Sequence, residues 1–254
     1  MDEAPMTLVA SEKLGRVSLV TLNRPARRNA LSTAGIQALE AALLAAEADP
    51  AIGAVLLRAA PPAFCAGSDL KELAGLDAAG MAAHEAITAG VARRVALMSK
   101  PVVAAVEGYA LGGGFILAVS CDVVVTARDA RWHLPEVTNG WLPPWGLGAL
   151  IARVGAVRAR LLTWGAEPIL GAEAQRIGVA DLLAEPGGAE ARALQLAQSL
   201  AALPPEAVAS TKRFYEAFAA MDAERLDNVA GRAFAADCAS PAARATFARF
   251  GAKP

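Results

Sequence analysis

The spacing of hydrophobic positions changes several times along this chain, and the changes predict strands alternating with helices. Residues 16–23 alternate and are rich in Val and Leu, which is typical of a strand. Behind Ser32, a candidate N-cap, residues 33–50 place apolar side chains at helical spacing until Pro50 ends the run. Three further short apolar runs predict buried strands: 54–59, 101–108 and 122–127.

This alternation predicts an α/β core with parallel strand pairing. The pattern ends at Pro186, Gly187 and Gly188, and the residues that follow read as helical. We therefore expect a core over residues 1–188 and a helical region over residues 189–254. Because the helical region is rich in Ala, Leu and Phe, we expect it to build a subunit interface.

Composition narrows the class of protein. The 254 residues carry a net charge of −1 and no basic run, which argues against nucleic acid as a partner. No apolar run is long enough for a membrane span, and the acidic start of the chain lacks the features of a signal peptide. Three unclustered cysteines and two histidines predict neither a disulfide framework nor a metal site. We expect a cytoplasmic protein.

Two glycine-containing turns carry the candidate chemistry. The glycines Gly112–Gly114 lie between two apolar runs, and as strand, turn and helix they would stand at a helix N-terminus, where free amides favour negative charge. A tight turn packed against a neighbour would explain them equally well. A second stretch, at 61–73, also leads from a strand through a turn with Gly67 into a possible helix. One amide from each turn could together clamp a carbonyl oxygen.

A family resemblance is carried by FCAGSDLKEL, KPVVAAVEGYALGGG, LPEVTNGWLPPWGLGALIARVG and ILGAEAQRIGVADLL. In this order, over about residues 15–185, they resemble the signatures of the crotonase (enoyl-CoA hydratase/isomerase) superfamily. The resemblance implies a crotonase-like spiral of ββα units with a C-terminal helical trimerisation region, assembled as a homotrimer or homohexamer. It also implies an acyl-CoA substrate whose coenzyme A is part of that substrate, with no separate cofactor.

The resemblance also assigns residues. The two amides that hold the thioester carbonyl belong to Ser68 and Gly113, and the catalytic glutamate is Glu136. The positions assigned to coenzyme A are Ala66, Ser68, Asp69, Leu70, Lys71 and Gly113. The positions assigned to the substrate pocket are Ile116, His133, Trp141 and Pro144.

The sequence departs from the hydratases of this superfamily at the groups that hold water. Those enzymes use two glutamates, and the second one would stand three residues after Gly113, where this chain has Ile116. A glycine amide that also helps to hold the water is replaced by Pro144, which has no N–H. We therefore expect hydration of crotonyl-CoA to be weak or absent.

One carboxylate is enough for a different reaction. A single glutamate can remove a proton near a thioester and return it elsewhere, so the leading hypothesis is enoyl-CoA double-bond isomerisation with Glu136 as the base. An apolar pocket of Ile116, Phe115 and tryptophans would raise the pKa of that base. The alternatives are a hydratase, decarboxylase or C–C hydrolase in which His133 or another group assists, and a CoA-binding scaffold without catalysis.

Overall fold

The computed structural model describes residues 7–219 and 222–251, so the acidic N-terminal stretch, on which the expectation of no signal peptide rests, lies outside the described residues. A six-stranded sheet forms the centre, in the order β1-β2-β3-β4-β6-β9. The pair β1–β2 is antiparallel and the other pairs are parallel. The strands are β1 Val9–Leu14, β2 Val17–Leu22, β3 Ala54–Ala59, β4 Val102–Val106, β6 Val123–Ala127 and β9 Leu182–Ala184. The predicted α/β class and parallel pairing are confirmed.

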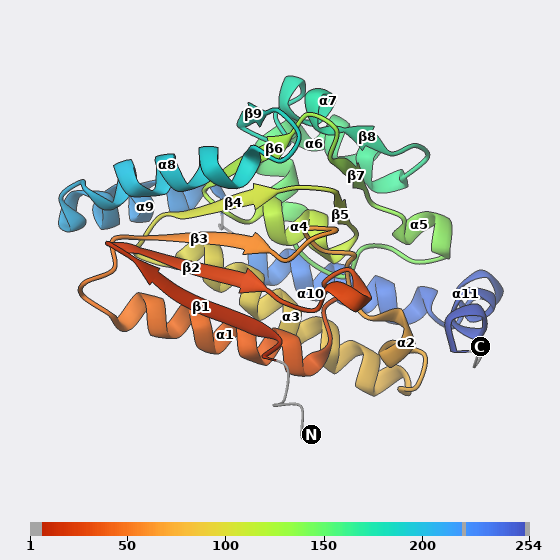
Figure 1. Cartoon of the computed structure of the whole chain (residues 1–254). Helices are drawn as coiled ribbons and strands as arrows, with labels where there is room; N and C mark the ends of the chain where they lie inside the picture. Colours follow the sequence, from red (N-terminus) through yellow and green to blue (C-terminus); the bar gives the residue numbers. More distant parts are fainter. Residues whose placement is uncertain (1–6, 220–221, 252–254) are drawn as a thin grey trace, which may run out of the picture.

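Helices cover both faces of this sheet (Figure 1). On one face lie α1 and α3, and on the other lies α8, against β3, β4 and β6. Covering both faces explains why all five residues of β4 are buried. The helices are α1 Thr33–Ala48, α2 Leu70–Leu73, α3 Ala78–Leu97, α4 Gly113–Val119, α5 Glu136–Asn139, α6 Leu147–Trp164, α7 Gly171–Arg176, α8 Ala189–Ala201, α9 Pro205–Ala219, α10 Ala223–Asp237 and α11 Pro241–Gly251.

The C-terminal helical region divides into two parts. Helix α8 begins at Ala189, where the composition changes, and buries an alanine at every fourth position: Ala189, Ala193, Ala197 and Ala201. These small side chains let α8 lie close to the sheet, so it belongs to the core. The later helices lie elsewhere: α10 packs on α3, and α11 packs on α2 and α5.

A small second sheet, in the order β5-β7-β8, extends the core toward the glycine turn. Its strands are β5 Tyr109–Leu111, β7 Arg131–His133 and β8 Ile169–Leu170. Because β5 ends at Leu111, this sheet delivers the backbone directly to the glycines at 112–114.

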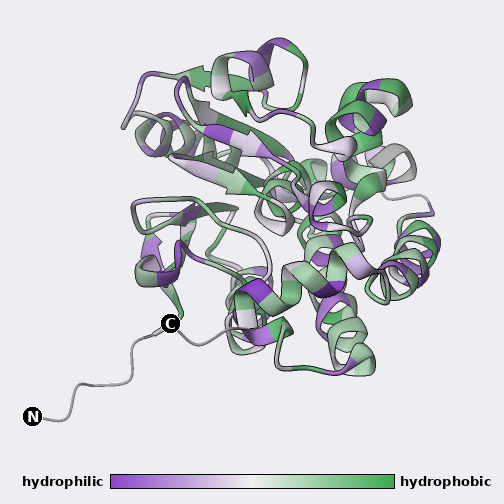
Figure 2. Ribbon diagram, turned by 90° about the vertical axis from the view of Figure 1, so that its right-hand side faces the viewer, coloured by the Kyte–Doolittle hydropathy of each residue, from purple (hydrophilic) through white to green (hydrophobic). Residues whose placement is uncertain are grey.

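The outer helices are amphipathic, and Figure 2 shows hydrophilic and hydrophobic residues alternating along them. Helix α6 leaves several large apolar side chains at the surface: Ile151, Val157, Leu161 and Trp164. Among the described residues, no helix is both long and apolar enough to cross a bilayer.

Candidate active site

The two predicted turns meet in the fold. A parallel β-bridge pairs Cys65 with Ala110, and the Leu111 amide donates a hydrogen bond to the Cys65 carbonyl at 2.9 Å. Beyond this pairing Gly67 adopts a φ of 86°, and a Cβ there would lie 3.0 Å from the Leu111 carbonyl oxygen and 3.1 Å from the Gly113 nitrogen. The turn at residue 67 therefore touches the turn at residue 113 through backbone alone.

The other glycines are explained in the same way. A Cβ on Gly114 would lie 2.3 Å from the Cys65 carbonyl oxygen, a contact that no side chain tolerates. Gly112 has a φ of 52° and ends the turn that leads into α4. The glycines thus form a tightly packed turn and also stand at a helix N-terminus, so the two explanations drawn from the sequence hold together.

Two amides remain available where the turns meet. Gly113 is the first residue of α4, a position whose N–H has no partner within the helix. On the other turn, the Asp69 amide donates to the Leu31 carbonyl at 2.9 Å, and the Leu31 amide donates to the Gly67 carbonyl at 2.8 Å. The Ser68 amide lies between these two hydrogen bonds and takes part in neither. Ser68 and Gly113 both line one cavity of about 50 Å³. This arrangement can hold a carbonyl oxygen as it gains negative charge.

Glu136 supplies a carboxyl group to the same cavity. It is the first residue of α5 and is 8% exposed. A Cβ on Gly112 would lie 2.8 Å from its Oε1, so the carboxyl group rests against the glycine turn. Its Oε2 is buried and has no hydrogen-bond partner among the described residues. A carboxyl oxygen left free in this way is available to exchange a proton.

Burial raises the pKa of Glu136 to about 8. The residue's own backbone amide opposes this increase in pKa, and the nearby charge of Glu85 adds to it. Since the ordinary value is 4.5, Glu136 keeps its proton to a higher pH than an exposed glutamate does.

Glu85 is a second carboxylate in this cavity, and no sequence pattern had pointed to it. It lies on α3 and is 5% exposed. Its Oε1 accepts a hydrogen bond from Ser68 Oγ at 2.8 Å, and its Oε2 accepts one from Trp145 Nε1 at 2.8 Å. Burial raises its pKa as well, while the His84 charge and these two donors act in the opposite direction. The cavity therefore contains two carboxyl groups, whereas the sequence predicted one.

One signal in the sequence could have revealed Glu85. It lies on the face of α3 that buries Ala89 and Ala92, four and seven residues later. An acid at a core-facing helical position is rare unless it has a partner or a function. No motif marks it, because its partners come from distant parts of the chain.

The remaining wall of the cavity is apolar. Ile116 is 1% exposed, and its side chain fills the space left by Gly146, where a Cβ would lie 2.0 Å from Ile116 Cγ2. Phe115 packs instead against Trp132, edge to face at 5.1 Å, and is not part of this wall. The predicted residues that do line the cavity are Ala66, Ser68, Leu70, Gly113, Ile116, Glu136, Trp141 and Pro144.

His133 does not line the cavity as predicted. Its Nε2 lies 2.8 Å from the Gly165 carbonyl oxygen, and its own carbonyl accepts a hydrogen bond from the Gly112 amide at 2.9 Å. The residue therefore fixes the glycine turn through its backbone while its ring faces away. It is not positioned to act as a second acid or base.

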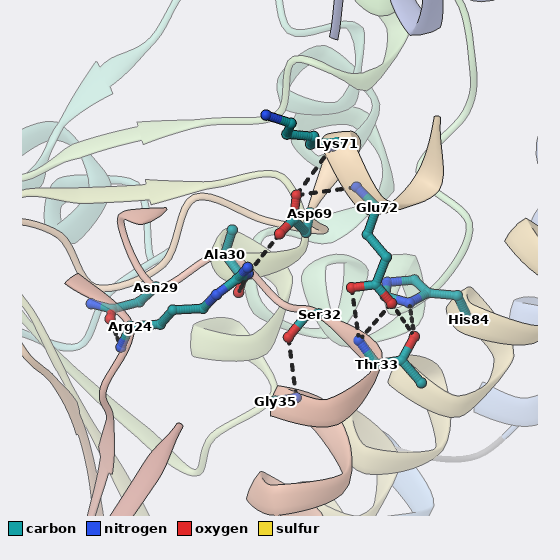
Figure 3. A network of polar contacts seen from close by, with 10 residues as sticks. All are labelled: Arg24, Asn29, Ala30, Ser32, Thr33, Gly35, Asp69, Lys71, Glu72 and His84. Atoms are coloured by element: carbon teal, nitrogen blue, oxygen red, sulfur yellow. Dashed lines mark hydrogen bonds and ion pairs between the residues drawn. The ribbon is translucent and has the colours of Figure 1, made fainter. Parts of the chain in front are cut away.

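Asp69 is also turned away from the cavity. Its carboxylate pairs with Arg24 at 2.6 Å and caps α2 by accepting hydrogen bonds from the amides of Lys71 and Glu72 (Figure 3). Asp69 therefore acts as the N-cap of α2, and any contact with coenzyme A would involve its backbone. Lys71 is exposed on α2.

Glu72 ties α2 to two other helices. It accepts a hydrogen bond from Thr33 Oγ1 at 2.6 Å, and that hydroxyl also lies 3.0 Å from His84 Nδ1 (Figure 3). These contacts join the start of α1 to α2 and to α3, beside the turn that carries Ser68. Among the residues that the structure describes, no group of His, Cys, Asp and Glu could hold a metal ion.

Comparison with known proteins shows what this chain is similar to. Residues 12–241 match the family model of enoyl-CoA hydratase/isomerase. The 2,3-dehydroadipyl-CoA hydratase of Escherichia coli is 40% identical over 200 residues, covering 78% of this chain and 77% of that protein. The short-chain-enoyl-CoA hydratase of Clostridium acetobutylicum is 35% identical over 81% of this chain and 79% of that protein. An enoyl-CoA hydratase/isomerase from Xanthobacter autotrophicus Py2 superposes with a TM-score of 0.86 at 29% identity, covering 97% of this chain and 94% of that one.

Proposed function

Because this chain belongs to the enoyl-CoA hydratase/isomerase family, we propose that it moves the double bond of an enoyl-CoA thioester, with Glu136 transferring the proton. The observation that carries this proposal is the Glu136 carboxyl group, buried beside the glycine turn with one oxygen unpartnered among the described residues. That group faces the cavity to which Ser68 and Gly113 bring their amides. A base and a site for the developing oxyanion are thereby combined.

The reaction follows from these groups. The ionised Glu136 removes a proton from C2 of a 3-enoyl thioester, and the electron pair moves onto the thioester oxygen. The amides of Ser68 and Gly113 stabilise that charge, each by about 2.7–4 kcal/mol in acyl chemistry. The same carboxyl group then returns the proton at C4, which yields the 2-enoyl thioester and regenerates the base. The reaction consumes nothing else, and coenzyme A serves only as part of the substrate.

We prefer isomerisation because two groups that hold water in hydratases of the superfamily are missing here. Ile116 puts a hydrocarbon side chain where hydratases of the superfamily place a glutamate. Pro144 also lines the cavity and has no N–H to donate.

Hydration is the second candidate, and Glu85 favours it. Each of its oxygens accepts one hydrogen bond and keeps a lone pair for water. In this reaction the water oxygen bonds to C3, Glu85 takes the water proton, and Glu136 gives a proton to C2, so that one water is added; Glu85 then loses its proton to solvent and Glu136 regains one from it. The named activity of the two relatives above is hydration, which supports the same alternative.

The test is to give the purified protein a 3-enoyl-CoA and crotonyl-CoA in separate assays. We expect isomerisation of the first and, for the second, hydration well below about 10 s⁻¹, a typical metabolic turnover. Hydration at or above that rate would establish the second candidate instead. If neither activity is found and neither thioester takes up deuterium from solvent, the results would favour a CoA-binding scaffold without catalysis.

We also infer a trimer or hexamer. The support is the apolar side chains left at the surface of α6, where Val157 is 74% exposed, Leu161 61% and Trp164 55%. Side chains of this size are commonly covered by a partner. Light scattering at micromolar concentration checks the inference, and a stable monomer would contradict it.

A further inference from the structure

Glu85 joins both halves of the site that would hold the thioester oxygen. It accepts a hydrogen bond directly from the Ser68 hydroxyl at 2.8 Å. It also holds the Trp145 indole, whose ring lies against Gly113, since a Cβ on Gly113 would be 3.0 Å from Trp145 Cζ2. A single carboxyl group on α3 therefore touches one oxyanion residue and orients the side chain packed on the other.

We propose that Glu85 is a positioning residue of this active site, which fixes the Ser68 and Gly113 turns and places a second negative charge beside Glu136. The inference rests on the proposed function only in that the turns hold a thioester oxygen. The proposal gives Glu85, on α3, two effects: it sets the geometry of the oxyanion site and the proton affinity of Glu136.

The His84 charge acts to lower the pKa of Glu85, but no cation of the described residues forms a salt bridge with it. Glu85 also lines a second cavity, of about 310 Å³, bordered by α3 and α10. The charged groups around Glu85 are Glu136 on α5, His84 and Arg93 on α3, Asp227 and Arg232 on α10, and the thiol of Cys238. Of these, Arg93 is already paired with Asp227.

The charge of Glu85 acts on Glu136, which lines the same cavity. A negative neighbour disfavours ionisation of a second carboxyl group, and the Glu85 charge does raise the pKa of Glu136. Removing that charge should lower the pKa of Glu136 below its wild-type value.

The experiment compares Glu85→Gln with the wild type, with Glu40→Gln as the matched control. Glu40 also contacts α3, through Arg94, but does not line the cavity. Thermal melting first establishes that each variant folds. The Glu136 carboxyl is then titrated by carbon NMR, its signal being assigned by its loss in Glu136→Gln. We expect a lower pKa of Glu136 in Glu85→Gln and an unchanged one in Glu40→Gln.

Kinetics complete the test. In Glu85→Gln we expect kcat for isomerisation to fall roughly 10- to 100-fold, as small misplacements do, with KM changed much less. Ser68→Ala, which keeps the amide, should add little in the Glu85→Gln background, because both changes break the same contact. The rising limb of kcat/KM should also move to lower pH.

Two results would overturn the proposal: a titration of Glu136 that is identical in Glu85→Gln and the wild type, or fully additive losses for Glu85→Gln and Ser68→Ala. The NMR titration needs no turnover. If no thioester is converted but the Glu136 titration shifts, the proposed reaction fails while the charge coupling stands.

Discussion

Two acids near the Ser68 turn, Asp69 and Glu136, have different hydrogen-bond partners and opposite shifts in pKa. Asp69 is paired with Arg24 and accepts two backbone amides, and although burial raises its pKa, these partners outweigh burial and lower it. Glu136 is buried to a similar extent, but one of its oxygens has no partner among the described residues, and its pKa rises to about 8. Two acids with a similar exposed fraction therefore have pKa values shifted in opposite directions.

The difference lies in what each carboxyl group gains when it ionises. For Asp69 the charged form gains an ion pair and two backbone hydrogen bonds in the folded state, so this acid adds to stability. For Glu136 the charged form loses water and gains little in exchange, which destabilises the fold above the ordinary pKa of a glutamate. Buried acids of the second kind are concentrated at functional sites, because the chemistry uses their raised proton affinity.

Replacing Glu136 with Gln should give the largest effect. The change keeps the shape of the side chain but removes its ability to take a proton, so turnover of a 3-enoyl-CoA should fall by about 10²–10⁴. Binding of the thioester, measured by calorimetry, should persist, because the amides of Ser68 and Gly113 are untouched. Asp69→Asn is the control and should lose far less activity. Exchange of the thioester's C2 proton at the wild-type rate in Glu136→Gln would assign the base to another group.

The same substitution should make the protein more stable at high pH. The folded-state pKa of about 8 lies above the ordinary 4.5, so the folded protein binds the extra proton between these values. The stability that Glu136 contributes is thus complete below about pH 4.5 and is lost as the pH rises through about 8. A tenfold change in proton affinity corresponds to about 1.4 kcal/mol, so Glu136→Gln should exceed the wild type by a few kcal/mol at pH 8 and hardly at all at pH 4.5.

Urea denaturation of both proteins at several pH values measures this difference. A free-energy gap that does not change with pH would show that Glu136 ionises as freely in the folded protein as in the unfolded chain.

Asp69→Asn should change stability with the opposite sign and to a smaller extent. Because the folded-state pKa of Asp69 is lowered, its contribution is present above the unfolded pKa and is lost as the pH falls through the folded one. The variant should lose about 1–3 kcal/mol at pH 7, the usual cost of removing a charged hydrogen-bond acceptor. The loss, measured by the same urea denaturation, should shrink in acid. Asp77→Asn, at the exposed N-cap of α3, is the control and should cost less.

Elements fixed by short-range contacts could be predicted from the sequence. Ser32 caps α1 by accepting a hydrogen bond from the Gly35 amide at 3.2 Å, three residues away. The strands at 54–59 and 122–127 and the helix that starts at Ala189 also lie where their local patterns predict. These elements can be predicted without the rest of the fold because each pattern spans only a few neighbouring residues.

The candidate site was predictable only in part. The family resemblance pointed to Glu136 and to the amides of Ser68 and Gly113, and the structure brings these three residues to one cavity. The orientation of His133 was not predictable, because its ring depends on Gly165, 32 residues away. The role of Asp69 as a partner of Arg24 is likewise hidden in the sequence, 45 residues apart.

Glu85 marks the boundary between what the sequence and the tertiary structure determine. By itself the sequence determined the family and the α/β core, and its motifs pointed to Ser68, Gly113 and Glu136, which the structure places around one cavity. Tertiary structure alone decided that an acid on α3 would meet Ser68, 17 residues earlier, and Trp145, 60 residues later. The physical reason is that the energy of a buried carboxyl group depends on whichever donors packing brings within about 3 Å, and no local pattern records them.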